Sequence, residues 1–214
     1  MLDTQALFTT KGLVFAGFLP YPDSSIPPGA ANFLAGESGC GKSSLLKMFN
    51  GTVSPTAGEI FYCGRTISDM PTLQLRRQVL LVGQEAYLFP ATIWENVKSF
   101  CKYRSAGEPS QEEFSQFLEM CCLSLPMDYD CLQLSGGERQ RLFLAIHLYF
   151  KPETILLDEP TSALDNETAT RLMGNITDFC RTKKINTVII SHSPEITKKF
   201  AENIIQLEKR SSDG

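Results

Sequence analysis

Gly36-Glu37-Ser38-Gly39-Cys40-Gly41-Lys42-Ser43-Ser44 is the stretch of sequence that decides the fold. It follows the apolar run Ala31 to Ala35, which predicts a strand, and it leads into Lys42 to Asn50, which predicts a helix ended by Gly51. A glycine-rich turn between a buried strand and a helix is typical of a parallel α/β sheet.

The chemistry of this loop is that of a phosphate-binding P-loop, whose pattern is Gly-x-x-x-x-Gly-Lys-Ser. Its glycines let successive backbone N–H groups converge on phosphate oxygens, and the following helix adds a favourable dipole. Lys42 can reach the terminal phosphates, and the Ser43 hydroxyl can ligate Mg²⁺. We therefore expect a nucleotide to bind at Gly36, Glu37, Ser38, Gly39, Cys40, Gly41, Lys42, Ser43 and Ser44.

Further apolar runs predict the rest of a mostly parallel sheet. Their residues do not alternate between apolar and polar, as expected of strands covered on both faces. These runs are Val79 to Val82, Thr154 to Leu157 and Thr187 to Ile190. Between Asp165 and Lys183 apolar residues recur at helical spacing, which predicts a helix that Asp165 caps and that packs on the sheet.

The length of the chain has room for one domain, so we expect residues 1–214 to form a single unit. Residues 1–84 and 135–214 predict the α/β core of a P-loop NTPase. The N-terminal segment to Ile26 and the run Gly58 to Cys63 predict additional strands, which we expect to form an antiparallel β subdomain on this core.

Residues 85–134 differ in character and predict a short helical insertion into the core. Helices are expected at Ile93 to Lys102 and at Gln111 to Cys122, because a Ser-Ala-Gly-Glu-Pro-Ser linker separates two helical patterns. A further helix is expected to begin at about residue 135, where the core resumes.

Two acids end the apolar run that begins at Thr154. Consecutive residues of a strand point to opposite sides, so the carboxylates of Asp158 and Glu159 need not share a role. Asp158 is suited to Mg²⁺, because this hard cation prefers oxygen ligands. Glu159 is suited to orient or deprotonate an attacking water as general base.

Leu134-Ser135-Gly136-Gly137-Glu138 is the most specific segment of the chain. Ser135 and the two glycines open a helix whose expected apolar stripe consists of Leu142, Ala145, Ile146 and Tyr149. Their hydroxyl and N–H groups can form a second anion site. With this segment the chain resembles the ABC ATPase family, whose signature has the form Leu-Ser-Gly-Gly-Glu/Gln.

The resemblance covers the chain from about Leu7 to Leu207 and implies roles for further residues. Gln84 stands at the family's Q-loop position, which implies that it senses Mg²⁺ and the nucleophilic water. His192 resembles the switch histidine that contacts the γ-phosphate, and Ser162 to Asp165 resemble the D-loop. Catalysis is thus expected from Glu159, His192 and Gln84, and Mg²⁺ coordination from Ser43, Gln84 and Asp158.

The resemblance also implies that two chains assemble head to tail on ATP binding, as a homodimer or as a heterodimer with a related ATPase. Each ATP would lie between the P-loop of one chain and Ser135, Gly136 and Gly137 of the other. An aromatic residue of the N-terminal strands would stack on adenine. Phe15, Phe18 and Tyr21 compete for this position, and Phe15 or Phe18 is favoured.

Charge and hydropathy narrow the partners and the compartment. A net charge of −4 supplies no basic footprint, so no nucleic acid is expected as a partner. No apolar run approaches the roughly 18 residues that cross a bilayer, and residues 1–5 carry Asp3 where a secretory signal carries bases. We therefore expect a cytoplasmic protein that lies peripherally on the cytoplasmic face of the cell membrane.

The expected membrane partner is a separate transmembrane permease. The resemblance places its docking groove beside Gln84, along Tyr87, Leu88 and Phe89, although these side chains would equally serve to pack the insertion on the sheet. Leu88 to Val97 resemble exporter-type ATPases, but no Glu-Arg-Gly element precedes the signature. The direction of transport therefore stays open.

The alternative to a transporter ATPase is a soluble ABC ATPase of another assembly, such as iron–sulphur cluster assembly, translation or DNA repair. Translation and repair members carry tandem ABC units or a coiled-coil insertion, and neither pattern is present in this sequence. Transport is therefore the favoured function.

Overall fold

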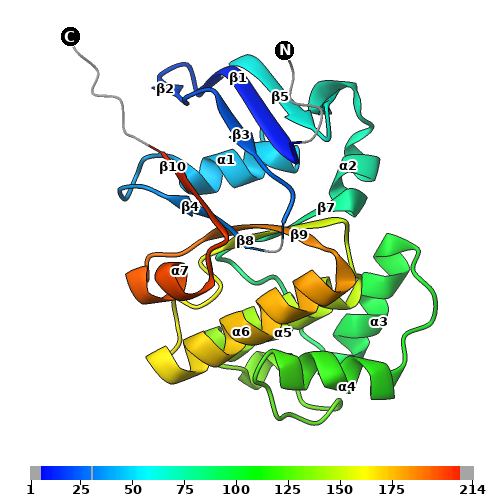
Figure 1. Ribbon diagram of the computed structural model, residues 1–214. Coiled ribbons are helices and arrows are strands. Elements are labelled where there is room, and N and C mark those ends of the chain that lie inside the picture. The colour runs from blue at the N-terminus through cyan, green and yellow to red at the C-terminus, as the bar shows by residue number, and fades with distance from the viewer. Residues whose placement is uncertain (1–5, 30, 208–214) are drawn as a thin grey trace.

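The computed structural model describes residues 6–29 and 31–207, so the expectation about a secretory signal at residues 1–5 lies outside the described residues (Figure 1). Two sheets and a layer of helices form the molecule. Figure 1 shows an antiparallel sheet at the top, helix α1 (Lys42–Phe49) beneath it, a parallel sheet in the middle, and helices α5 and α6 below. The predicted α/β class with a P-loop core and an antiparallel β part is confirmed.

The parallel sheet has the strand order β10-β4-β9-β8-β7. Neighbouring strands pair in parallel throughout, for example Leu156 with Val188. The predicted runs all form strands, and their bounds differ from the expected ones by at most one residue. They are β4 (Asn32–Ala35), β7 (Val79–Val82), β8 (Thr154–Asp158) and β9 (Asn186–Ile190).

Both faces of this sheet are covered, which explains the continuous apolar runs. Ile155 and Leu157 of β8 pack in the core on the side of α5 (Gly136–Tyr149) and α6 (Asn166–Lys183). Leu156 lies between them in sequence and packs on the opposite side with residues of α1 and the antiparallel sheet. Asp165 caps α6 as predicted, because its Oδ1 accepts a hydrogen bond from the backbone N–H of Thr168 at 2.9 Å.

The antiparallel sheet is built from the N-terminal segment and from the chain after α1. Strand β1 pairs with β2, β3 and β5, and β5 pairs with β6, in antiparallel register. A short 3₁₀ helix and the helix α2 then lead to β7. The elements are β1 (Phe8–Phe15), β2 (Leu19–Pro20), β3 (Ser24–Ile26), β5 (Ala57–Tyr62), β6 (Arg65–Thr66), η1 (Ile67–Asp69) and α2 (Thr72–Gln78).

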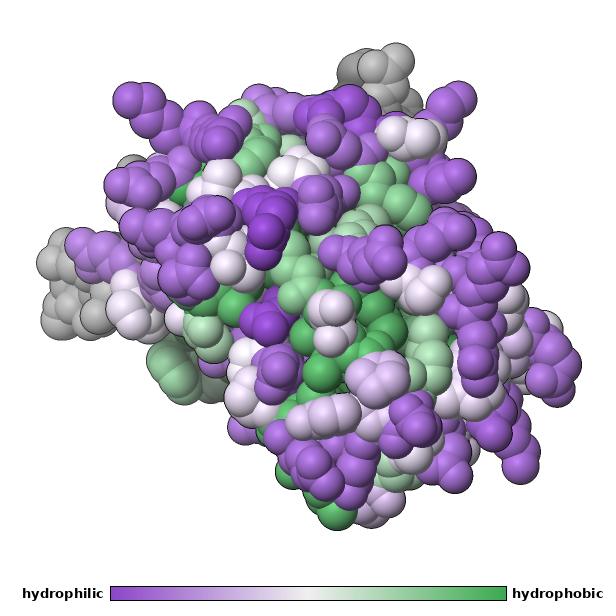
Figure 2. Space-filling view, turned by 90° about the horizontal axis from the view of Figure 1, so that it is seen from below, coloured by the Kyte–Doolittle hydropathy of each residue, from purple (hydrophilic) through white to green (hydrophobic). Residues whose placement is uncertain are grey.

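The helical layer contains α3 (Ile93–Arg104), α4 (Gln111–Met120), the 3₁₀ helix η2 (Cys131–Gln133) and α5. The expected helices of the 85–134 segment are therefore present, while the domain boundaries at residues 84 and 135 stay a prediction. On the face of the molecule that this helical layer forms, apolar residues gather in the middle and hydrophilic residues surround them (Figure 2).

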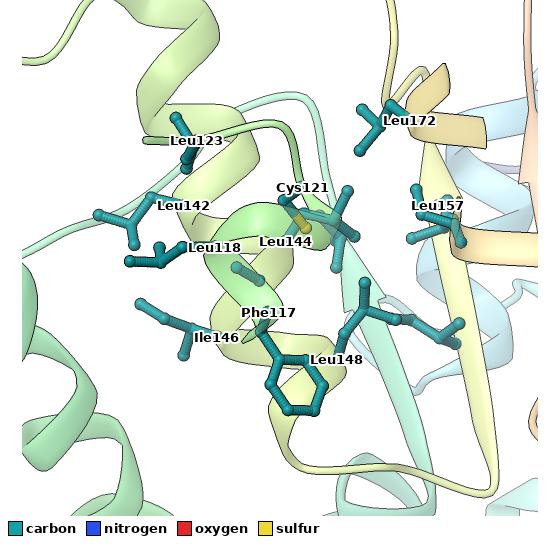
Figure 3. Close-up of a cluster of buried hydrophobic side chains, with 14 of the residues drawn as sticks. Phe117, Leu118, Cys121, Leu123, Leu142, Leu144, Ile146, Leu148, Leu157 and Leu172 are labelled. Atoms are coloured by element: carbon teal, nitrogen blue, oxygen red, sulfur yellow. The ribbon is translucent and has the colours of Figure 1, made fainter. Parts of the chain in front are cut away.

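Helix α5 is buried more completely than the expected apolar stripe implied. Leu144 and Leu148, which lie outside that stripe, are also buried, whereas Tyr149 is only partly buried. Figure 3 shows why: Phe117 and Leu118 of α4 and Cys121 directly after it lie on one side of α5, and Leu157 and Leu172 belong to the sheet and α6 beyond it. Each fully buried leucine contributes about 1.5–3 kcal/mol relative to an exposed one.

Three asparagines tie the amino ends of neighbouring parallel strands together. Each is the first residue of its strand: Asn32 of β4, Asn186 of β9 and Asn203 of β10 (Asn203–Gln206). Asn203 Nδ2 donates to Oδ1 of Asn32 at 3.0 Å, and Asn32 Nδ2 donates to the Thr187 carbonyl at 3.0 Å. Oδ1 of Asn186 accepts from the Gly29 N–H at 2.9 Å, so side chains cross-link this end of the sheet.

The short elements that were not among the expected ones include α2, α7 (Pro194–Phe200) and β10. Each of the two helices has only two turns, and β10 is an edge strand with half of its residues exposed, so their apolar patterns are weak. Within residues 6–29 and 31–207, none of the helices combines the length and the apolar character that a membrane crossing requires.

Candidate active site

A cavity of about 420 Å³ lies at the carboxyl ends of the parallel strands. The loop after β4, Gln84 after β7, Glu159 after β8 and His192 after β9 all line it, together with the turn after β1. The carboxyl ends of parallel strands meet at one edge of a sheet, which is where ligands of α/β proteins bind. The lining residues are Phe15, Phe18, Leu19, Ser38, Gly39, Gly41, Lys42, Ser43, Ser44, Gln84, Glu159 and His192.

The glycine-rich loop takes a shape that depends on Gly41. This residue precedes α1 with φ +90°, a left-handed conformation that glycine adopts without strain. A Cβ atom at Gly41 would collide with the hydroxyl of Tyr21. That hydroxyl donates a hydrogen bond to the Gly41 carbonyl at 2.9 Å, and burial of the ring raises the pKa of Tyr21 to about 12. Tyr21 thus packs against Gly41 and holds the backbone of the loop through this hydrogen bond.

Lys42 holds the loop from inside. Its side chain is buried, and its Nζ donates to the carbonyls of Gly36 and Glu37, both at 2.8 Å. Cys40 is also buried, with its Sγ 3.9 Å from Nζ. The ammonium group therefore lies within the curl of the loop, beside the backbone that would surround a phosphate.

Asp158 offers a carboxylate oxygen to a ligand. Its Oδ1 is buried and has no hydrogen-bond partner within the described part of the chain. Burial raises the pKa of Asp158, while a hydrogen bond from the Ser43 side chain counteracts this. Residues 6–29 and 31–207 contain no cluster of three or more His, Cys, Asp or Glu that could hold a metal by themselves. The free Oδ1 of Asp158 and the hydroxyl of Ser43 are oxygen donors of the kind that a hard cation such as Mg²⁺ prefers.

Glu159 turns away from Asp158 because the backbone leaves the strand at this point. Its φ is +54°, and its N–H donates to the Ile190 carbonyl at 3.0 Å. Its Oε1 lies 2.8 Å from Nε2 of His192. A second hollow of about 310 Å³ adjoins this pair and is lined by Ser162 of the expected D-loop among others. The two adjacent acids thus face different surroundings, as the sequence predicts.

The signature residues lie apart from this cavity. Ser135 caps α5 in a capping box, in which Glu138 accepts hydrogen bonds from the Ser135 N–H at 2.9 Å and from its hydroxyl at 2.6 Å. Ser135 and Gly136 are exposed, and neither they nor Gly137 line the cavity that contains Lys42. A ligand held by this helix end would therefore differ from one held by the same chain's P-loop.

The aromatic candidates separate by burial. Phe15 and Phe18 both line the cavity, and Phe18 is 78% exposed. Tyr21 is only 6% exposed and lies beneath the loop, so its ring face is not accessible to a base. The residues that the sequence favoured for adenine are thus the two that reach the cavity.

Gln140 was not among the expected site residues, although it contacts the site. Its Nε2 donates to the Glu159 carbonyl at 3.1 Å. In the sequence this polar residue lies between Arg139 and Arg141, so no local pattern marks it as buried. Such residues are buried only when their polar atoms are paired.

Comparison with known proteins gives consistent matches. The model of the ABC transporter family matches residues 22–162. The probable iron export ATP-binding protein FetA of Escherichia coli (strain K12) is 32% identical over 192 residues, covering 88% of this chain and 84% of the relative. Multidrug resistance protein sirA of Leptosphaeria maculans is 35% identical over 200 residues, covering 86% of this chain.

The relatives differ in length. This chain spans 15% of the sirA protein and at most 47% of two other curated relatives that it matches. Among solved structures, the ATP-binding cassette MJ0796, described as dimeric and bound to ADP and Pi after hydrolysis, superposes with a TM-score of 0.82 at 28% identity. The match covers 95% of this chain and 97% of that one. The family model, the FetA relative and this fold together show that the chain belongs to the ABC transporter family, as an ATP-binding domain.

Proposed function

We propose that this chain binds ATP with Mg²⁺, hydrolyses it to ADP and phosphate, and powers a membrane transporter through ATP-driven pairing of two such domains. One observation carries the proposal. A single cavity unites the phosphate loop around Lys42 with Gln84, Glu159 and His192, and the unpaired oxygen of Asp158 lies beside Ser43.

In this function each residue acts on a different part of the reaction. The loop N–H groups and Lys42 hold the phosphates, and Phe15 or Phe18 stacks on adenine. Ser43, Asp158 and Gln84 hold Mg²⁺, which when bound neutralises developing phosphate charge. Glu159 orients and deprotonates the attacking water. His192 holds the Glu159 carboxylate in place and contacts the γ-phosphate.

Pairing of two chains is part of the proposal, because Ser135, Gly136 and Gly137 are separated from their own P-loop cavity. Exposed hydroxyl and N–H groups at the start of α5 can bind the γ-phosphate of ATP held by a partner. The dimeric state described for MJ0796 supports this arrangement. The partner is a second copy or a related ATPase.

The transmembrane permease is proposed to dock beside Gln84. Tyr87 is 66% exposed and Tyr103 is 75% exposed, and both rings contact Phe89, at 5.3 and 6.0 Å between centroids. Leu88, by contrast, is buried in the core, so the segment both packs the helices and presents aromatic surface. In this proposal the docked domain lies on the cytoplasmic face of the membrane.

Two experiments test the proposal. The purified chain is incubated with ATP and Mg²⁺, and phosphate release is measured; no release above that of a Glu159→Gln variant would contradict the ATPase. A tagged chain is then recovered from detergent-solubilised membranes. Co-purification of a multi-span protein supports transport, and recovery with a soluble assembly alone would contradict it.

A further inference from the structure

The side chain of Gln140 links helix α5 to the backbone of Glu159. Gln140 is 7% exposed, and its Nε2 donates to the Glu159 carbonyl at 3.1 Å. The same carbonyl accepts the Ser162 N–H at 3.2 Å, so both of its lone pairs have partners. The turn that carries Glu159 is therefore fixed partly by a residue of another element.

This fixation matters because Glu159 has an unfavourable backbone conformation. A φ of +54° is uncommon for a residue with a side chain and persists only where the surroundings hold it. The N–H bond to Ile190 fixes one side of the residue, and the bond from Gln140 fixes the other. The direction of the Glu159 carboxylate follows from this backbone geometry.

Helix α5 makes a second contact with the same turn. A Cβ atom at Gly137 would lie 3.6 Å from the carbonyl oxygen of Ala163, so the start of the helix adjoins the chain just after Glu159. Gly137 and Gln140 are three residues apart, roughly 4.5 Å along the helix axis. Leu142 and Leu144 are fully buried and anchor the helix in the core just after Gln140. A displacement of the helix start therefore moves the turn that contains Gln140.

We propose that Gln140 is a positioning residue that transmits the state of the α5 start to the carboxylate of Glu159 in the same chain. The inference rests on the proposed function, in which the α5 start binds the partner's ATP and Glu159 acts on the chain's own ATP. Each nucleotide thereby influences the base of the opposite site through one helix and one hydrogen bond. The sites hydrolyse ATP cooperatively as a result.

Gln140→Met tests this, because methionine fills a similar volume but has no N–H donor. Gln140→Asn is the second variant, since its amide is one methylene too short to reach the carbonyl. Gln78→Met is the matched control: Gln78 Nε2 also donates at 3.1 Å, to Oε1 of Glu153, far from the cavity residues in the fold. The chain is assayed in the assembly in which the parent hydrolyses ATP, and kcat, KM and the Hill coefficient for ATP are measured.

Both Gln140 variants are expected to lower kcat by about 10- to 100-fold, the cost of a misplaced catalytic group. KM should change by less than a factor of about two, because P-loop contacts remain, and the Hill coefficient should fall to 1. Gln78→Met should keep all three values. Parental kcat and Hill coefficient in either folded Gln140 variant would overturn the inference, as would equal losses in Gln78→Met. A parent chain without ATPase activity would instead overturn the proposed function itself.

Discussion

Nε2 of His192 lies 2.8 Å from Oε1 of Glu159, although the two residues follow different strands of the parallel sheet. The Glu159 side chain is 18% exposed and the His192 side chain 52%, so the carboxylate is the more enclosed partner. The adjacency of β8 and β9 produces this pair: Asp158 and Ile190 are register partners, Glu159 directly follows Asp158, and His192 lies two residues after Ile190. A carboxylate held at one oxygen leaves the other available to a water.

Replacement of Glu159 by Gln should abolish turnover while keeping nucleotide binding. The amide fits the same place but cannot accept a proton, so phosphate release should fall by about 10²–10⁴-fold. Gel filtration with ATP should then show a persistent dimer. Glu153→Gln, just before the opposite end of β8, serves as the control and should retain activity. Normal steady-state hydrolysis by the Glu159 variant would exclude the general-base role.

Replacement of Lys42 by Ala should weaken ATP binding by at least about tenfold, because charge-assisted hydrogen bonds to the phosphates are lost. Titration with a fluorescent ATP analogue measures the Kd. Lys198→Ala removes an exposed lysine of α7 and should leave the titration unchanged. Equal binding by the parent and the Lys42 variant would refute the P-loop assignment.

Replacement of Asp158 by Asn should raise the unfolding midpoint of the nucleotide-free protein. The pKa of Asp158 is raised in the folded protein, so folding favours the protonated carboxyl group. The stability that this group contributes is present at low pH and is lost as the pH rises through the folded pKa. At neutral pH the charge therefore costs stability, and the amide removes that cost.

The Asp158→Asn variant should also lose the part of the stabilisation of the protein by ATP that depends on Mg²⁺. Ligand at 100 times its Kd stabilises the parent by about 2.7 kcal/mol, which thermal unfolding detects. Asp128→Asn, in an exposed loop position, is the control. If Asp158→Asn keeps the full Mg²⁺-dependent shift, Asp158 is not a metal ligand.

Replacement of Tyr21 by Phe should weaken ATP binding by several-fold, because the loop carbonyl of Gly41 loses a donor worth about 1 kcal/mol. Tyr62→Phe is the matched control, since that buried hydroxyl makes a 3.0 Å hydrogen bond with Thr154 away from the cavity. Both variants should lose stability, but only the Tyr21 variant should lose affinity. Equal Kd values in the two variants would contradict a supporting role for Tyr21.

His147 should make the protein less stable in mild acid. Burial lowers the pKa of His147 from its ordinary 6.5 to about 4; the nearby charge of Arg104 contributes to this lowering, and the hydrogen bond with the Phe143 carbonyl at 2.7 Å opposes it. The unfolded chain binds a proton below pH 6.5 but the folded chain does not until about pH 4.

The free energy of unfolding should therefore fall by up to about 3 kcal/mol as the pH drops through this window. His147→Phe, in a pocket with the rings of Phe100 and Phe143, should remove that component. Urea unfolding of parent and variant at pH 7 and pH 4.5 measures the difference. Parallel losses in both proteins would show that His147 does not titrate in this way.

The local elements of the fold follow directly from the sequence. The ends of the loop at Gly41 and of the apolar runs around it can be predicted locally. Glycine and the change from strand to helix periodicity of the apolar residues are short-range signals. Helix α5 is buried beyond the expected stripe, since Leu144 and Leu148 are buried outside it, while Tyr149 of the stripe packs on Phe114 and Phe117 of α4. Helix propensity and stripe width do not report a second covering layer.

The meeting of Glu159 with His192 and with Gln140 depends on strand order, which no local pattern specifies. Strand β9 lies between β4 and β8, so a residue near the end of the chain reaches the loop near its start. The identity of the acids and of His192 suggested chemistry, but their distances required the sheet. The burial of Tyr21 has the same cause, because it depends on the antiparallel sheet closing over α1.

The asparagine cross-links at Asn32, Asn186 and Asn203 make the two ends of the parallel sheet unequal. One end is secured by side chains that recognise backbone atoms and carries no part of the cavity. At the other end, loops of different length supply all the chemistry. Substitutions and insertions in those loops can therefore accumulate without disturbing strand order, so a lineage can alter nucleotide handling and partner contacts while inheriting the same frame.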